Sequence, residues 1–247
     1  MLYQPGKTAH NLPFDPFKAC VVPRPIGWIS TTSPRLTFDP PYVMFSVNQT
    51  PHHHDSGLSG EGEATRKDTV RNIEATGKFA WNLAMYDLRE AVNITAQQVP
   101  PGVDEFQSVG LEKEFTSCLP GDLPGSEDGK NGNPVPMVKA SPVKFECVYH
   151  STLRLPGNGP VGTVDVVIGR VAGFHIADWA LNERGRLDVR RTRPIARCGY
   201  YEYAVVGGEG TIFEMVIPGL DELTLAGLEG YKEKVDKWMG AKEKAKL

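Results

Sequence analysis

With 247 residues, 40% of them hydrophobic and 23% charged, the chain has the size and composition of one large globular domain or two small ones. A net charge of −3 gives no general attraction to nucleic acid or to an anionic membrane, so a bound phosphate would need local donors. No stretch approaches the roughly 20 apolar residues of a membrane span, and the first residues lack the apolar core of a signal peptide, which favours a cytoplasmic protein.

Glycine and proline punctuate the whole sequence. The 26 glycines and 20 prolines separate many short apolar runs, a pattern that favours β structure with long loops. We expect an extended arm over 1–17, a main domain over 18–218 and a helical tail over 219–247.

The first predicted strand, 19–32, holds one arginine between two prolines. Pro23 and Pro25 fix their own φ and favour extended backbone before them, so Arg24 is presented from a stiff strand. The strand ends in small hydroxyl side chains: Ser30, Thr31 and Thr32. A guanidinium and hydroxyls at a strand end suit a phosphate or another oxyanion, and the alternative is simply an exposed strand end.

A second strand is predicted over 42–47, beside the first in the expected sheet. Ser46 and Asn48 lie at its end, where they could donate hydrogen bonds to a ligand. A polar loop follows over 50–66.

A helix is then predicted, with Asp68 as its N-cap, Val70 and Ile73 on one face, and Gly77 as its C-terminal stop. The start of a helix favours a bound anion through its free amides and its dipole. The candidates for such a site are Arg66, Lys67, Asp68 and Thr69. The alternative for the two basic residues is a solvated loop charge.

The remaining elements are read from periodicity and caps. We expect a strand over 79–83, a helix capped by Asp87, a short helical turn over 104–111 and a polar surface excursion over 119–136. Further strands are predicted over 143–149, 163–176, 200–206 and 211–217. In the strand over 143–149, Lys144 and Glu146 are expected to point outward. Gly169 and Gly173 are expected to mark β-bulges.

Aromatic and histidine side chains leave alternatives open. Trp28, Phe45 and Trp81 fit either the apolar wall of a ring-binding site or the ordinary core. His150 follows a predicted strand and is either a site residue or a surface histidine. The tract at 52–54 consists of adjacent histidines, which do not easily face one ion, so we predict no metal site.

Four segments carry a family resemblance, in this order: VVPRPIGWIST at 21–31, RKDTVRNIEATGKFAWNL at 66–83, DLREAVNITA at 87–96 and RTRPIARCGYYEYAVV at 191–206. Together they resemble the flavin reductase-like family of FMN-binding split-barrel proteins, which includes flavoredoxin-like flavoproteins. The resemblance covers most of 18–206.

The resemblance implies a mainly β, six-stranded split barrel with flanking helices, assembled as a homodimer. It implies FMN as cofactor, with the hydroxyls of the first strand and the basic residue of the Lys67-Asp68-Thr69 motif around its phosphate. NADH or NADPH would be a transient reductant that passes hydride to the flavin. His150 would approach the flavin edge.

Three functions remain open after this reading. The first is an FMN-dependent NAD(P)H:flavin reductase, and the second is a non-catalytic protein that stores or carries FMN. The third is a scaffold with an impaired flavin site, because the segment near 33–39 is shorter than the family pattern by roughly one short strand.

Overall fold

The computed structural model describes residues 24–25, 37–38, 41–48, 66–97, 99, 103–122, 134–157 and 163–213, with backbone alone at 24–25 and 37–38. The chain divides into two compact units, Met1–Gly208 and Glu209–Leu247, and every described helix and strand lies in the first. The predicted boundaries at 17/18 and 218/219 fall outside the described residues, as does the tail helix. No helix within the described ranges is long and apolar enough to cross a membrane.

The described strands form three sheets, and the chain is mainly β, as predicted. The five-stranded sheet has the order β2 (Thr37–Phe38), β3 (Pro41–Asn48), β8 (Val164–Ile176), β7 (Val143–Leu155) and β4 (Lys78–Asn82). The three-stranded sheet has the order β1 (Arg24–Pro25), β9 (Ile195–Arg197) and β10 (Tyr203–Val205), and β5 (Lys113–Phe115) pairs with β6 (Pro136–Val138). A closed barrel of six strands stays a prediction.

The helices within the described ranges are short. They are α2 (Asp68–Thr76), α3 (Arg89–Ile94), α4 (Glu105–Ser108) and α5 (Val189–Thr192), with 3-10 turns at Tyr86–Leu88 and Asp178–Ala180. Gly77 ends α2 with φ 73°, as predicted, because a left-handed residue without a Cβ fits this position. Asp104 caps α4 by accepting a hydrogen bond from the Phe106 amide. The predicted Asp87 cap is wrong: the chain enters that helix through a 3-10 turn, and Asp87 lies 3.6 Å from Arg193 instead.

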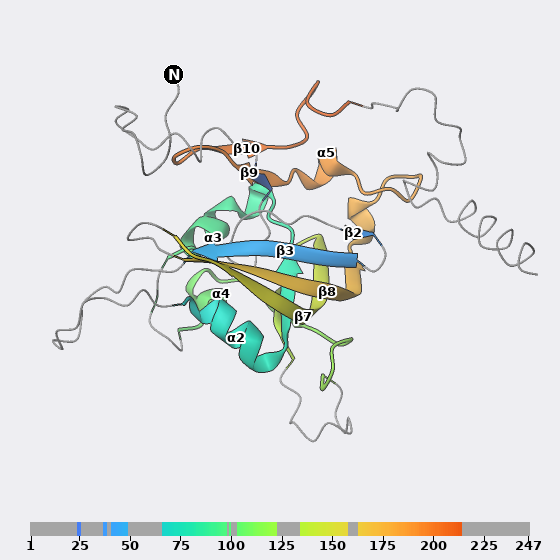
Figure 1. The fold of residues 1–247 in the computed structure, drawn as a ribbon. Coiled ribbons are helices and arrows are strands. Elements are labelled where there is room, and N and C mark those ends of the chain that lie inside the picture. Colours follow the sequence, from blue (N-terminus) through green and yellow to red (C-terminus); the bar gives the residue numbers. More distant parts are fainter. Residues whose placement is uncertain are drawn as a thin grey trace, which may run out of the picture. The chain divides into compact units, whose positions relative to one another are not determined.

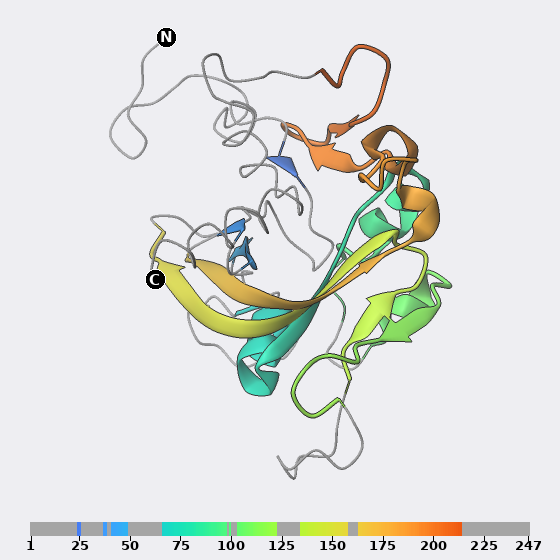
Figure 2. The ribbon, with the colours of Figure 1, turned by 90° about the vertical axis from the view of Figure 1, so that its right-hand side faces the viewer.

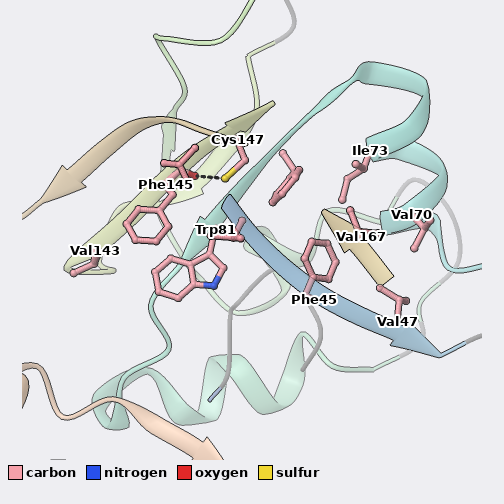
Figure 3. Packing of buried hydrophobic residues seen from close by; sticks show 12 residues of the cluster. Phe45, Val47, Val70, Ile73, Trp81, Val143, Phe145, Cys147 and Val167 are labelled. Carbon is pink, nitrogen blue, oxygen red and sulfur yellow. Dashed lines mark hydrogen bonds between the residues drawn. The ribbon is translucent and has the colours of Figure 1, made fainter. Parts of the chain in front are cut away.

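The main core lies between α2 and one face of the five-stranded sheet (Figures 1 and 3). Alternation along β3 buries Val43, Phe45 and Val47 on this face, and α2 contributes Val70 and Ile73. Trp81 stacks on Phe145 with ring centroids 4.6 Å apart. Phe45 and Trp81 are 2% and 7% exposed, so both belong to the core rather than to an open ring-binding wall.

The opposite face of β7 is covered as well. The prediction that Lys144 and Glu146 point away from the main core is correct, but both side chains are buried. The segment that contains β5 lies over them, since Lys144 Nζ is 2.7 Å from Glu114 Oε2 and Glu146 accepts the amides of Ser117 and Cys118. Alternation alone cannot reveal this second layer, which comes from a distant part of the chain.

Two compensating register shifts bend the long β7–β8 pair, whose curvature is visible in Figure 2. Ala172 is the extra residue on β8, and His150 is the extra residue on β7. The shifts lie beside Gly173 and Gly169, where the sequence predicts bulges. At Gly169 a Cβ would come within 2.3 Å of the Phe79 ring, so only glycine fits there without a shift of the core.

Candidate functional site

The start of α2 and the end of β3 lie at the same end of the five-stranded sheet. Val47 pairs with Asp165 of β8, and Arg66 Nε donates to Asp165 Oδ2 over 3.0 Å. Residues 66–69 are therefore held close to the strand end that carries Ser46 and Asn48, both half-buried. The structure thus brings two groups of predicted site residues, about 20 positions apart in the sequence, to one end of the sheet, but the side chains of Ser46 and Asn48 alternate with the core residues of β3 and point to the face opposite α2.

Arg66 is engaged by two carboxylates rather than held free for an anion. Its two terminal nitrogens each donate to Glu74 over 2.6 Å, and its Nε is used by Asp165. The hydrogen bonds to Glu74 raise the pKa of Arg66 and lower the pKa of Glu74. Arg66 therefore anchors α2 to the sheet, and the prediction that it binds an anion is corrected.

Lys67 occupies the N-cap position of α2, with φ −60° and ψ 146°. Its carbonyl accepts the Val70 amide over 3.0 Å, which starts the helix. Within the described ranges its ammonium forms no hydrogen bond or ion pair. Its charge nevertheless reaches Glu105 of α4: burial raises the pKa of Glu105, and Lys67 acts in the opposite direction.

Asp68 is the first residue of α2 and not its cap, which corrects the sequence prediction. The helix begins one residue earlier because Lys67 already has the extended backbone of a cap. The Asp68 carboxylate therefore faces the next turn, where it pairs with Arg71. Thr69 is half-buried in the first turn.

Arg24 lies in a different sheet from Ser46 and Asn48. The register places it directly across from Arg197 of β9, and β1 is an edge strand, where a proline is tolerated. The prediction that this strand lies beside β3 is therefore wrong for Arg24–Pro25. The remaining candidates on the predicted first strand lie outside the described residues: Trp28, Ser30, Thr31 and Thr32.

Sequence reasoning did not single out Arg197 and Tyr203, which pair with each other across β9 and β10. The Arg197 guanidinium lies 4.7 Å from the centroid of the Tyr203 ring and also donates to the Tyr200 carbonyl. The signal was present in the segment RTRPIARCGYYEYAVV, where an arginine and three tyrosines fall within seven residues. α4 lies between this region and α2, since Glu105 is within electrostatic reach of Lys67 and Phe106 packs against the core cluster that contains Ile195.

His150 is not brought to the end of the sheet where Lys67 lies. It is exposed, and its ring centroid is 5.3 Å from that of Tyr42 at the other end of β3. Tyr42 and Asn48 are six positions apart, about 20 Å along an extended strand. The histidine tract at 52–54 lies outside the described residues, and the part of the chain that is described contains no cluster of metal-ligating side chains.

Comparison with known proteins places the chain in a family. Residues 21–193 match the family model described as Flavin reductase like domain. An uncharacterized protein of Aquifex aeolicus (strain VF5) is 30% identical over 191 residues, which are 76% of this chain and 87% of the relative. The uncharacterized protein YwrF of Bacillus subtilis (strain 168) is 26% identical over 206 residues, which are 78% of this chain and 88% of the relative.

Solved structures show the same fold. Nitrilotriacetate monooxygenase component B from Bacillus cereus is 22% identical with a TM-score of 0.65, over 87% of this chain and 98% of that chain. A protein with a split barrel domain from Shewanella frigidimarina NCIMB 400 is 18% identical with a TM-score of 0.53, over 78% of this chain and 83% of that chain. The chain therefore belongs to the flavin reductase-like domain family and has a split-barrel fold.

Proposed function

We propose that this protein is an FMN-dependent oxidoreductase that accepts hydride from NADH or NADPH. Family membership supports a flavin, and Lys67 supports one that carries a phosphate, as FMN does and riboflavin does not. The ammonium of the half-buried Lys67, at a helix start and without a hydrogen bond or ion pair among the described residues, fits a phosphate because the helix amides and the dipole favour an anion there. Lys67 is the single observation that carries the choice of a phosphate-bearing flavin, and FMN is the one that the sequence resemblance implies.

The roles of the protein in this proposal are binding and positioning. Lys67 and the first-turn amides of α2 would hold the phosphate. Ser46 and Asn48 alternate with the core residues of β3 and lie on the sheet face opposite α2, where they stay predicted contacts of another part of the cofactor. A bound flavin would supply the hydride-accepting ring nitrogen. Arg24 and the hydroxyls at Ser30, Thr31 and Thr32 stay predicted contacts of the cofactor.

Absorbance titration with FMN tests the first part of the proposal. Bound FMN should shift the visible spectrum of the flavin and saturate. An affinity weaker than about 50 μM, close to −6 kcal/mol, would contradict FMN binding and favour the scaffold function. Stopped-flow mixing with NADH or NADPH tests the second part: rapid bleaching is expected, whereas a bound flavin that stays oxidised would favour a carrier.

Lys67→Ala tests the phosphate contact directly. A charge-assisted hydrogen bond contributes roughly 1.5–3 kcal/mol, so FMN affinity should fall by about 10- to 150-fold. Riboflavin lacks the phosphate, and its affinity should change little. Lys139→Ala is the control. It removes the same charge from an exposed lysine that follows β6 and pairs with Glu112. Equal losses for FMN and riboflavin in Lys67→Ala would contradict the phosphate role.

We also propose that the protein is a homodimer. The resemblance implies this assembly, and an exposed apolar surface on β7 supports it: the exposed fractions of Leu153 and Leu155 are 56% and 46%. They pair with Val166 and Val164 of β8, so the apolar surface spans both strands. Light scattering should give twice the chain mass, and Leu153→Asp should shift the protein toward monomer. A monomeric wild-type protein at micromolar concentration would contradict the proposal.

A further inference from the structure

We infer that Asp165 is a positioning residue that holds Lys67 in place for the cofactor phosphate. This inference rests on the function proposed above. Asp165 touches neither Lys67 nor the expected phosphate position through any contact in the structure, so its effect would be exerted through Arg66.

Asp165 is a buried carboxylate with both oxygens in use. It is 1% exposed on β8, and its Oδ2 accepts from Arg66 Nε over 3.0 Å. Its Oδ1 accepts from Arg154 Nε of β7 over 2.9 Å. An isolated buried carboxylate would be strongly destabilising, so these charge-assisted bonds fix the carboxylate and its partners in one geometry.

Arg66 connects this carboxylate to the helix. It precedes α2 and reaches Glu74 in the last half of that helix through two parallel 2.6 Å hydrogen bonds. The guanidinium is therefore held at its Nε by the sheet and at its two terminal nitrogens by α2. The backbone between these anchors carries Lys67, so the position of the lysine is set by the same contacts.

The network is neutral and leaves Lys67 outside it. The two positive charges of Arg66 and Arg154 equal in number the two negative charges of Asp165 and Glu74. Val70 and Ile73 already hold α2 to the sheet by apolar packing, so an ion network of partly exposed side chains around one buried carboxylate is not needed merely to attach the helix. The network fixes the backbone at the start of α2. The ammonium of Lys67 takes part in none of these ion pairs.

The test compares FMN with riboflavin in Asp165→Asn. The substitution keeps the shape but removes the charge that orients Arg66, so FMN affinity should fall by about 10-fold or more, as expected when a binding group is misplaced. Riboflavin affinity should change less than about 2-fold, within the scatter of small effects. A purely structural role would weaken both ligands equally or neither.

Asp122→Asn is the matched control. Asp122 is also a buried aspartate in an ion pair, with Lys78 Nζ at 2.7 Å and a side-chain exposure of 0%. Lys78 follows the C-terminal end of α2, about 13 Å from the helix start at 1.5 Å per residue. This variant should lose stability without changing the ratio of FMN to riboflavin affinity. A change in that ratio equal to the change in Asp165→Asn would overturn the inference.

A double mutant separates this inference from the proposed function. If Asp165 acts through Lys67, then Asp165→Asn should not change the FMN to riboflavin ratio further in a Lys67→Ala background. If Lys67→Ala alone lowers FMN affinity and Asp165→Asn does not, the inference fails and the proposed function stands. If Lys67→Ala has no FMN-specific effect, the proposed phosphate contact itself fails.

Arg66→Lys covers the case in which Asp165→Asn melts below the assay temperature. Lysine keeps the charge but cannot bind Asp165 and both oxygens of Glu74 at once. The same FMN-specific loss is expected, and an unchanged FMN to riboflavin ratio would overturn the inference.

Discussion

Two buried carboxylates, on neighbouring strands, are stabilised in different ways. Asp165 of β8 is 1% exposed and accepts from two arginines. Glu146 of β7 is 0% exposed and accepts from the backbone amides of Ser117 and Cys118, over 3.0 and 2.7 Å to Oε2, with His175 Nε2 2.6 Å from Oε1. Each carboxylate holds a different element to the sheet, α2 in one case and the segment after β5 in the other.

The two carboxylates differ in whether their hydrogen-bond donors carry a charge that needs its own counter-ion. Backbone amides are neutral, and they bind a carboxylate without bringing other ionic partners. Arginines bring permanent charge, which must be balanced in turn, and Glu74 supplies that balance next to Arg66. The arginine network therefore spreads over β7, β8 and α2, whereas the contacts of Glu146 stay local to one segment and one histidine.

Asp165→Ala should have the largest effect on stability. It removes the shared acceptor of Arg66 and Arg154, and breaking a buried ion pair by removing one partner costs about 3–5 kcal/mol. Both arginines are partly exposed, so we expect the lower end of this range. Equilibrium denaturation measures the loss, and a value below about 1 kcal/mol would show that water replaces the carboxylate easily.

Glu146→Gln should have an intermediate effect. Both oxygens of Glu146 accept hydrogen bonds from amides, so a glutamine must turn its NH₂ group toward another N–H donor. The unsatisfied contact should cost about 1–3 kcal/mol without creating a cavity. Hydrogen exchange should accelerate at the amides of Ser117 and Cys118 and not in α2. Equal acceleration in both places would contradict the local character of this network.

Glu74→Gln should show a smaller, pH-dependent effect. Hydrogen bonding and charge from Arg66 lower the pKa of Glu74 below its usual 4.5. The ionised form is thus favoured in the folded state, so the stabilisation is fully present above about pH 4.5 and is lost as the pH falls through the lower folded value.

The glutamine variant should be less stable than the wild type by about 1 kcal/mol at neutral pH, since both partners are partly exposed to solvent. Denaturation as a function of pH should show this gap closing in acid. A gap that is constant from neutral pH down to pH 3 would mean that the charge of Glu74 is not involved.

In the flavin-free protein, Lys67→Ala should have the smallest effect, a change in the pKa of one carboxyl group. Lys67 lowers the pKa of Glu105, which burial raises, so its removal should raise that pKa further. The pKa of Glu74 should not move, because Arg66 sets it. Carboxyl NMR titration can follow both groups, and a shift at Glu74 would show that Lys67 belongs to the arginine network after all.

Local patterns in the sequence were sufficient for much of the fold. Alternation predicts β3, β4 and the first half of β7, and Gly77 marks the end of α2. The capping predictions at Asp68 and Asp87 failed because a carboxylate near a helix start has other partners available in the folded chain, Arg71 and Arg193 respectively.

Less of the candidate site than of the fold could be predicted from the sequence. Asp165 carried a signal, since a lone charge on the core-facing side of an apolar strand must be paired. Its partner Arg66 lies 99 positions away, and no spacing rule connects the two. The same limit applies to Arg197, whose position across from Arg24 depends on pairing between the two ends of the domain.

Ala172 and His150 have no pairing partner in the β7–β8 ladder, so a residue could be removed at either position without changing the other pairs. Odd-numbered residues of β8 up to Val171 face α2, whereas Gly173 and His175 face Glu146, because the extra residue changes the phase. Removing both extra residues would keep every other pairing partner and side-chain face. Removing Val167 instead would turn every β8 side chain on one side of the deletion to the opposite face of the sheet. Homologues and engineered variants should therefore tolerate single-residue deletions at these two positions, and melting temperatures of such variants can measure that tolerance.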